Sequence, residues 1–98
     1  MNAFQFDDAR MPTDTEQAGL CQLVYLAFVD IRALILDGKS QQAKDLAEAF
    51  HNIPLFMNTA NFSFKAFQDS IQRYQAKYKD GTRYNYLQEW GKLNAAKQ

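Results

Sequence analysis

His51 is the residue best suited by its type to acid–base chemistry, and it is the one histidine in the chain. A general acid or base needs a group that orients it, and Glu48 lies three residues earlier. Asn52 follows directly and could hydrogen-bond a carbonyl group of a bound molecule. His51 and Asn52 are therefore the candidate pocket residues. We favour another interpretation, in which His51 lies in the last turn of a helix and hydrogen-bonds exposed carbonyl groups there.

Cys21 is the single cysteine, which excludes a disulfide within the chain. No cationic residue lies within a helical turn of it to activate its thiol, so we expect a core residue. One histidine and one cysteine on different predicted helices, without paired spacing, do not fit a zinc site. The sequence therefore predicts no catalytic residue, no metal and no cofactor.

The most apolar segment of the chain is residues 20–36, where fourteen of seventeen residues are apolar or aromatic. It belongs to a predicted first helix that begins with a capping box formed by Thr13 and Glu16. Gly38 ends this helix, because glycine adopts the left-handed conformation without penalty. A helix that is apolar almost all round must be covered on both flanks.

The predicted core side of this helix spans an arc of about 140°. It comprises Leu20, Leu23, Val24, Ala27, Phe28, Ile31, Leu34 and Ile35. The opposite side carries Tyr25, Leu26, Val29 and Leu36 among Gln22, Asp30 and Arg32. This side is more apolar than a solvent-exposed face normally is. We expect a contact between subunits there, with Tyr25, Leu26 and Val29 as candidate interface residues.

Three further helices are predicted. Ser40 is the candidate cap of the second, and Pro54 prevents its continuation. Its apolar residues recur with helical spacing, namely Ala43, Leu46, Ala47 and Phe50. The third runs from about residue 63 to residue 79 with an apolar seam of Phe64, Phe67, Ile71, Tyr74 and Tyr78. Thr82 can cap a shorter fourth helix.

These elements predict an all-α fold, with residues 1–98 forming a single domain of one core. We expect a four-helix up-and-down bundle in which residues 1–12 form a loose N-terminal arm, with Phe4 and Phe6 docking on the body. In residues 53–62 the apolar residues do not recur with a sustained helical or strand spacing. We therefore predict a crossover loop that bounds one end of the core.

Aromatic residues are concentrated in residues 74–90. Tyrosine and tryptophan are favoured at protein interfaces because they bury a large area and keep a polar tip. We expect about half of these aromatic residues to cover the core of a small domain, which leaves the others for a contact with a partner. Tyr84, Tyr86 and Trp90 are therefore further candidate interface residues.

The chain has no net charge, but residues 1–64 are acidic and residues 65–98 are basic. A basic face with Lys65, Arg73, Lys77 and Lys79 could contact nucleic acid. Asp69, four residues from both Lys65 and Arg73, favours local ion pairs on a solvated face instead. We expect the two halves to pack together, within the molecule or across a dimer.

The N-terminal segment lacks the basic and apolar regions of a signal peptide, so we expect a cytoplasmic protein. Residues 20–36 are short for a membrane span and contain Asp30 and Arg32, so no membrane association is expected.

The segment LAEAFHNIP, residues 46–54, together with YQAKY, residues 74–78, resembles small uncharacterised bacterial all-helical proteins. The longer segment GKSQQAKDLAEAFHNIP, residues 38–54, also looks like the second half of a tetratricopeptide unit. Its proline comes one residue early, and the chain holds no second copy of the unit. The resemblance implies a helical hairpin and no activity.

The absence of a chemical motif beside an excess of apolar surface favours a non-enzymatic protein-interaction module, a small homodimer that acts as a binding, regulatory or immunity-type partner of another protein. One alternative is a pocket for a small molecule or an enzymatic reaction around His51 and residues 53–62. The other is a nucleic-acid contact through the basic C-terminal half.

Overall fold

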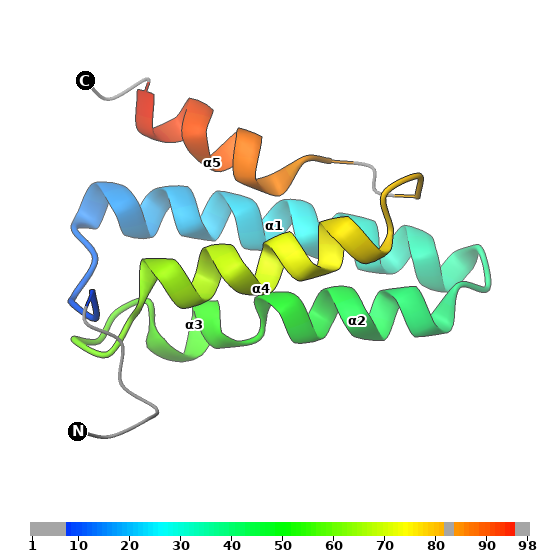
Figure 1. The fold of residues 1–98 in the computed structure, drawn as a ribbon, viewed down its shortest axis with the longest axis horizontal. Helices are drawn as coiled ribbons and strands as arrows, with labels where there is room; N and C mark the ends of the chain where they lie inside the picture. The colour runs from blue at the N-terminus through cyan, green and yellow to red at the C-terminus, as the bar shows by residue number, and fades with distance from the viewer. Residues whose placement is uncertain (1–7, 82–83, 96–98) are drawn as a thin grey trace.

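The computed structural model describes residues 8–81 and 84–95, and helices make up most of this part (Figure 1). The helices are α1 (Asp14–Leu36), α2 (Ser40–Phe50), α3 (Asn52–Phe56), α4 (Phe64–Lys77) and α5 (Tyr86–Ala95). No strand occurs within the described residues, so the predicted all-α class is confirmed.

The ends of the helices follow from local hydrogen bonds. Both halves of the predicted capping box are present, since Thr13 Oγ1 accepts from the Glu16 amide at 3.1 Å and Glu16 Oε1 accepts from the Thr13 amide at 2.9 Å. Gly38 has a φ of 77° just after α1, as predicted. Ser40 is instead the first residue of α2, whose N-cap Lys39 makes no side-chain cap.

The later helices are capped by polar side chains. Ser63 Oγ accepts from the Ala66 amide at 3.0 Å and caps α4. Asn85 Oδ1 accepts from the Gln88 amide at 3.1 Å and serves the start of α5. Thr82, the predicted cap of this helix, lies outside the described residues.

The four longer helices surround one core. Both α1 and α4 contact α2 and α5, so α1 and α4 lie across the core from each other. In Figure 1, α4 passes in front of α1, and α2 runs along the lower edge. The short helix α3 contacts α1 and α2 at the end of the molecule where α1 begins.

Every longer helix contributes to the core. Its buried apolar residues are Leu20, Leu23, Ala27, Leu34, Ala43, Leu46, Phe50, Ile53, Phe62, Phe67, Ile71, Tyr74, Tyr86 and Trp90. The aromatic seam of α4 is confirmed, with Phe67, Ile71 and Tyr74 buried and with Phe64 and Tyr78 packed against them. Ala47 was predicted on the core side of α2 and is exposed.

Residues 53–62 were predicted as a loop, but most of α3 lies within them. The Met57 amide donates a hydrogen bond to the Ile53 carbonyl at 2.9 Å, which closes this helical turn.

Residues 8–12 were predicted to be loose, but they are tied to the start of α4. The Asp8 carboxylate accepts from the Ser63 hydroxyl at 2.6 Å and from the Lys65 amide at 2.8 Å. The Arg10 amide donates to the Phe62 carbonyl at 2.9 Å. Phe4 and Phe6 lie outside the described residues.

Candidate functional site

The side of α1 that faces away from α4 carries large apolar side chains in contact with solvent. Tyr25 is 62% exposed, Phe28 68%, Ile35 57% and Leu36 68%. At 100° per residue these positions share one arc with the exposed Val29. We call the exposed side of α1, from Asp14 to Leu36, the apolar face; its polar members are Asp14, Thr15, Gln22 and Arg32.

The apolar face overlaps the predicted interface only in part. Tyr25 and Val29 are exposed, as expected of candidate interface residues, whereas Leu26 is half-buried and packs on the core. Phe28 and Ile35 were predicted in the core, and that assignment is wrong. Cys21 was also expected in the core and is exposed on the apolar face.

The C-terminal aromatic residues lie elsewhere. Tyr86 is fully buried, and Trp90 stacks on Phe64 and meets Phe67 edge-on at centroid distances of 5.9 and 5.6 Å. Tyr84 is half-buried against the core. These burials correct the expectation of an outer aromatic surface, because Tyr86 and Trp90 are core residues.

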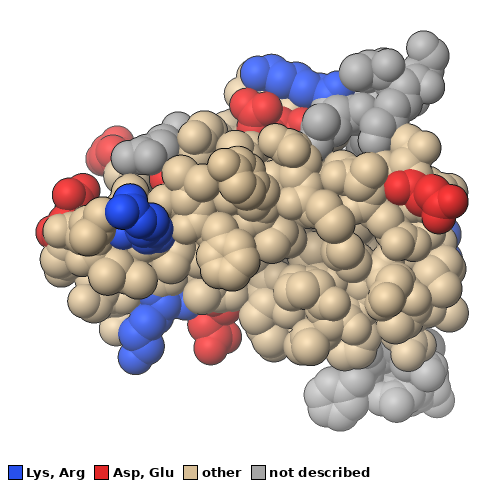
Figure 2. All heavy atoms as spheres, turned by 180° about the vertical axis from the view of Figure 1, so that it is seen from behind, with Lys and Arg blue, Asp and Glu red and all other residues tan. Residues whose placement is uncertain are grey.

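Figure 2 views the molecule from the side opposite to Figure 1, where α1 is no longer covered by α4. Uncharged side chains fill the middle of this view, and charged groups lie toward its edges. A soluble monomer rarely exposes a contiguous apolar patch of more than a few hundred Å² without using it. The apolar face is therefore the first candidate functional site.

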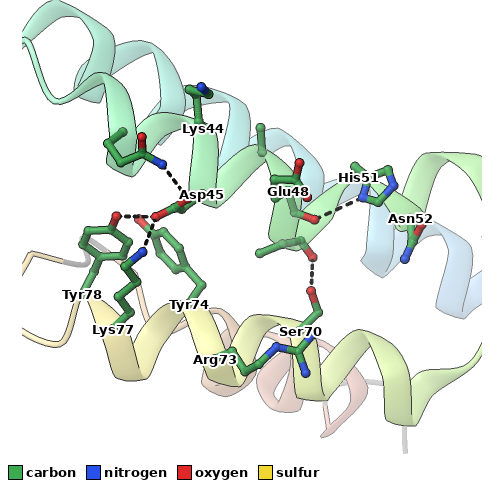
Figure 3. A pocket seen from close by; sticks show the side chains of 13 residues that line it. Lys44, Asp45, Glu48, His51, Asn52, Ser70, Arg73, Tyr74, Lys77 and Tyr78 are labelled. Atoms are coloured by element: carbon green, nitrogen blue, oxygen red, sulfur yellow. Dashed lines mark hydrogen bonds and ion pairs between the residues drawn. The ribbon is translucent and has the colours of Figure 1, made fainter.

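A second candidate is a groove of about 890 Å³ between α2 and α4 (Figure 3). The α2 side carries Lys44, Asp45 and Glu48, and the α4 side carries Arg73 and Lys77. Both candidate pocket residues, His51 and Asn52, line one end. Residues 53–62, which were expected to bound the pocket, do not line it.

The polar groups of the groove are mostly engaged with one another. Asp45 accepts hydrogen bonds from Tyr78 at 2.5 Å, Lys77 at 2.9 Å and Gln41 at 3.0 Å. The bonds from Tyr78 and Lys77 lower the pKa of Asp45 to about 2. Asp45 is therefore an ionised carboxylate held by its own chain and is a poor general base.

His51 and Asn52 are both exposed at the end of the groove. Nδ1 of His51 lies 3.2 Å from the backbone carbonyl oxygen of Glu48, as Figure 3 shows, whereas its predicted orienting partner was the Glu48 carboxylate. This contact fits a histidine that closes the last turn of α2. Among the described residues, no three His, Cys, Asp or Glu side chains cluster so that they could hold a metal ion.

Two of the described basic residues of the C-terminal half are paired with acidic side chains. Lys77 forms an ion pair with Asp45 at 2.9 Å, and Lys92 lies 3.6 Å from Glu89. In the described part of the chain, Asp69 forms no ion pair with Lys65 or Arg73, contrary to our expectation.

The chain matches no protein-family model, no curated protein and no solved structure. Among the described residues, α1 is the one helix long and apolar enough to cross a membrane, a test that the core helix of a soluble protein and a signal sequence near the N-terminus also pass. Leu20 and Leu23 of α1 are fully buried in the core.

Proposed function

We propose that this protein is a non-enzymatic protein-interaction module that binds its partner through the apolar face of α1. The observation that carries the proposal is the exposure of Tyr25, Phe28, Ile35 and Leu36 on one side of a helix whose other side is in the core. Exposed apolar surface costs roughly 25 cal/mol per Å², and a partner chain that covers it recovers this free energy.

The partner that we propose is a second copy of the chain. The chain has zero formal net charge, so no long-range repulsion opposes self-association. The apolar face is about 33 Å long from Asp14 to Leu36. The neighbouring helix α3 carries two more exposed apolar side chains, Leu55 and Phe56.

We further propose that the four longer helices form an up-and-down bundle and that the protein works in the cytoplasm. Figure 1 draws successive longer helices in opposite directions, which supports the bundle. The buried side chain of Asp30 and the packing of Leu20 and Leu23 support a soluble protein, because α1 would have to leave this core to cross a membrane.

Sedimentation equilibrium tests the proposal. The wild type is expected to have twice the monomer mass at micromolar concentration, and a Tyr25→Glu/Phe28→Glu variant is expected to be a folded monomer. Both side chains are exposed, so the substitutions remove no core packing.

The matched control is Gln68→Glu/Gln72→Glu, which adds the same charge at two exposed positions of α4, across the core from α1. This control should remain dimeric. A wild-type chain that stays monomeric at all concentrations overturns the proposal, as does a monomer that sediments with phosphatidylcholine vesicles through the same face.

A second candidate function is the binding of a small molecule in the groove between α2 and α4. The volume of about 890 Å³ favours it, since ligand pockets occupy a similar range. The ionic contacts within the groove favour it less, because Asp45 already has three donors from its own chain.

A further inference from the structure

The apolar face of α1 differs between its two halves in both side-chain size and charge. The N-terminal half presents the carboxylate of Asp14 and the small side chains of Ala18 and Cys21. The C-terminal half presents the large rings of Tyr25 and Phe28 and the guanidinium of Arg32. All of these side chains are exposed.

Asp14 and Arg32 lie on the same line along the helix. They are eighteen residues apart in the sequence, which is five helical turns and about 27 Å. They are therefore too far apart to pair within one chain. Among the described residues neither side chain forms an ion pair or a hydrogen bond.

A twofold axis perpendicular to α1 makes the two helices antiparallel and pairs unlike positions, because residue i of one copy contacts residue j of the other and the reverse. An axis at the level of Leu23, midway between the charged residues, places Asp14 of each copy opposite Arg32 of the other. The same axis brings Phe28 to the level of Ala18, and Tyr25 to the level of Cys21. A parallel arrangement would instead place Arg32 against Arg32 and each ring against the same ring.

We propose that two copies dock antiparallel, α1 against α1, with Asp14 of each chain paired to Arg32 of the partner subunit. This inference rests on the proposed function and adds the orientation and register of the dimer. Large side chains opposite small ones allow the helix axes to approach to the usual 8–10 Å. The two ion pairs lie near the ends of the interface, with Ile35 and Leu36 of each chain beyond them, and they fix the register more than they add affinity.

Disulfide cross-linking between two variants that carry their single cysteine at different positions tests the register. Asp14→Cys and Arg32→Cys are each introduced with Cys21→Ser, so that each chain carries one thiol. The two variants are mixed, allowed to exchange subunits and oxidised. With random pairing about half of the dimers contain one chain of each variant. These dimers should form one disulfide between the two chains, which is visible on a non-reducing gel.

Either variant oxidised alone should give no covalent dimer, because its two thiols would lie about 27 Å apart across the twofold axis. A Lys65→Cys/Cys21→Ser chain, labelled at an exposed position of α4, is the control for collisional oxidation and should not cross-link with either. Circular dichroism checks that each variant keeps the helical content of the wild type.

The outcomes separate this inference from the proposed function. A dimer in which Asp14→Cys cross-links to itself is parallel or has its twofold axis near residue 14, and either arrangement overturns the inference alone. A dimer by sedimentation whose mixed sample forms no covalent bond also overturns only the register. A chain that is monomeric by sedimentation overturns both.

Discussion

The hydroxyl of Tyr86 on α5 donates a 2.5 Å hydrogen bond to Oδ2 of Asp30 on α1, 56 residues away in the sequence. Both side chains are buried, Tyr86 completely and Asp30 with 4% of its surface exposed. Burial, together with the Asp30 carboxylate, raises the pKa of Tyr86, so its hydroxyl keeps the proton that it donates. The bond connects α5 to α1 and contributes one donor to a buried carboxylate, a group whose burial is costly unless it is hydrogen-bonded.

Tyr86→Phe is expected to lower the free energy of unfolding by about 1–3 kcal/mol, because a buried acceptor loses a donor while the ring keeps its packing. Urea denaturation at neutral pH measures this change. Tyr84→Phe is the matched control: Tyr84 is half-buried, and its hydroxyl has no hydrogen bond among the described residues. Equal losses for the two variants would show that the bond to Asp30 does not stabilise the fold.

The same bond explains why the core side of α1 was only partly predictable. A carboxylate is normally placed on the solvent side, so the predicted arc avoided Asp30 and included Phe28 and Ile35. In the structure, the buried arc of α1 is displaced by roughly 60° around the helix axis from the predicted arc. Asp30 is therefore buried, and Phe28 and Ile35 are exposed. Nothing local to Asp30 indicates that a tyrosine 56 residues later will donate a hydrogen bond to it.

Local signals were predicted better than distant ones. The capping box of Thr13 and Glu16 and the left-handed Gly38 depend on residues a few positions apart, and both were confirmed. The contact of Asp8 with Ser63 joins residues 55 apart, and the sequence carries no periodicity that would reveal it. The groove is likewise formed by packing α4 on α2, so His51 and Asn52 were found but most of its lining was not.

The capping box also predicts that the free energy of unfolding depends on pH. The hydrogen bond from Arg10, together with those from Thr13, lowers the pKa of Glu16 from 4.5 to about 2. A carboxylate whose pKa is lower in the folded state stabilises the protein above its unfolded pKa, and this stabilisation is lost as the pH falls from about 5 to 2.

Glu16→Gln should therefore lower the free energy of unfolding at pH 7 by about 1 kcal/mol, the scale of a helix cap. At pH 2 it should have almost no effect. Thermal unfolding at a series of pH values measures both. Arg10→Gln should weaken the dependence of stability on pH between about pH 5 and pH 2, because it removes the partner that keeps Glu16 ionised. A Glu16→Gln loss of equal size at pH 2 and pH 7 would contradict this assignment.

Phe67 tests the assignment of the α4 seam to the core. It is buried against Trp90 and Phe62, so Phe67→Ala should cost about 3–5 kcal/mol of unfolding free energy. Lys65→Ala, two residues away on the exposed side of the same helix, should change it by less than about 0.5 kcal/mol. Urea denaturation of both variants gives the comparison, and similar losses would mean that the buried side of α4 is wrongly identified.

His51 distinguishes the interaction module from a small-molecule site in the groove. If His51 only closes α2 through the Glu48 carbonyl, His51→Gln should reduce the free energy of unfolding by at most about 1–2 kcal/mol and leave the dimer unchanged. If the groove binds a small molecule, His51→Gln and Arg73→Gln should both keep the fold and the dimer but lose that molecule. Mass spectrometry of what denaturation releases from the purified wild type and from each variant measures the difference. A compound held by the wild type and by neither variant would contradict the non-enzymatic interaction module as the whole function, because His51 follows α2, Arg73 lies on α4, and the two side chains share only the groove.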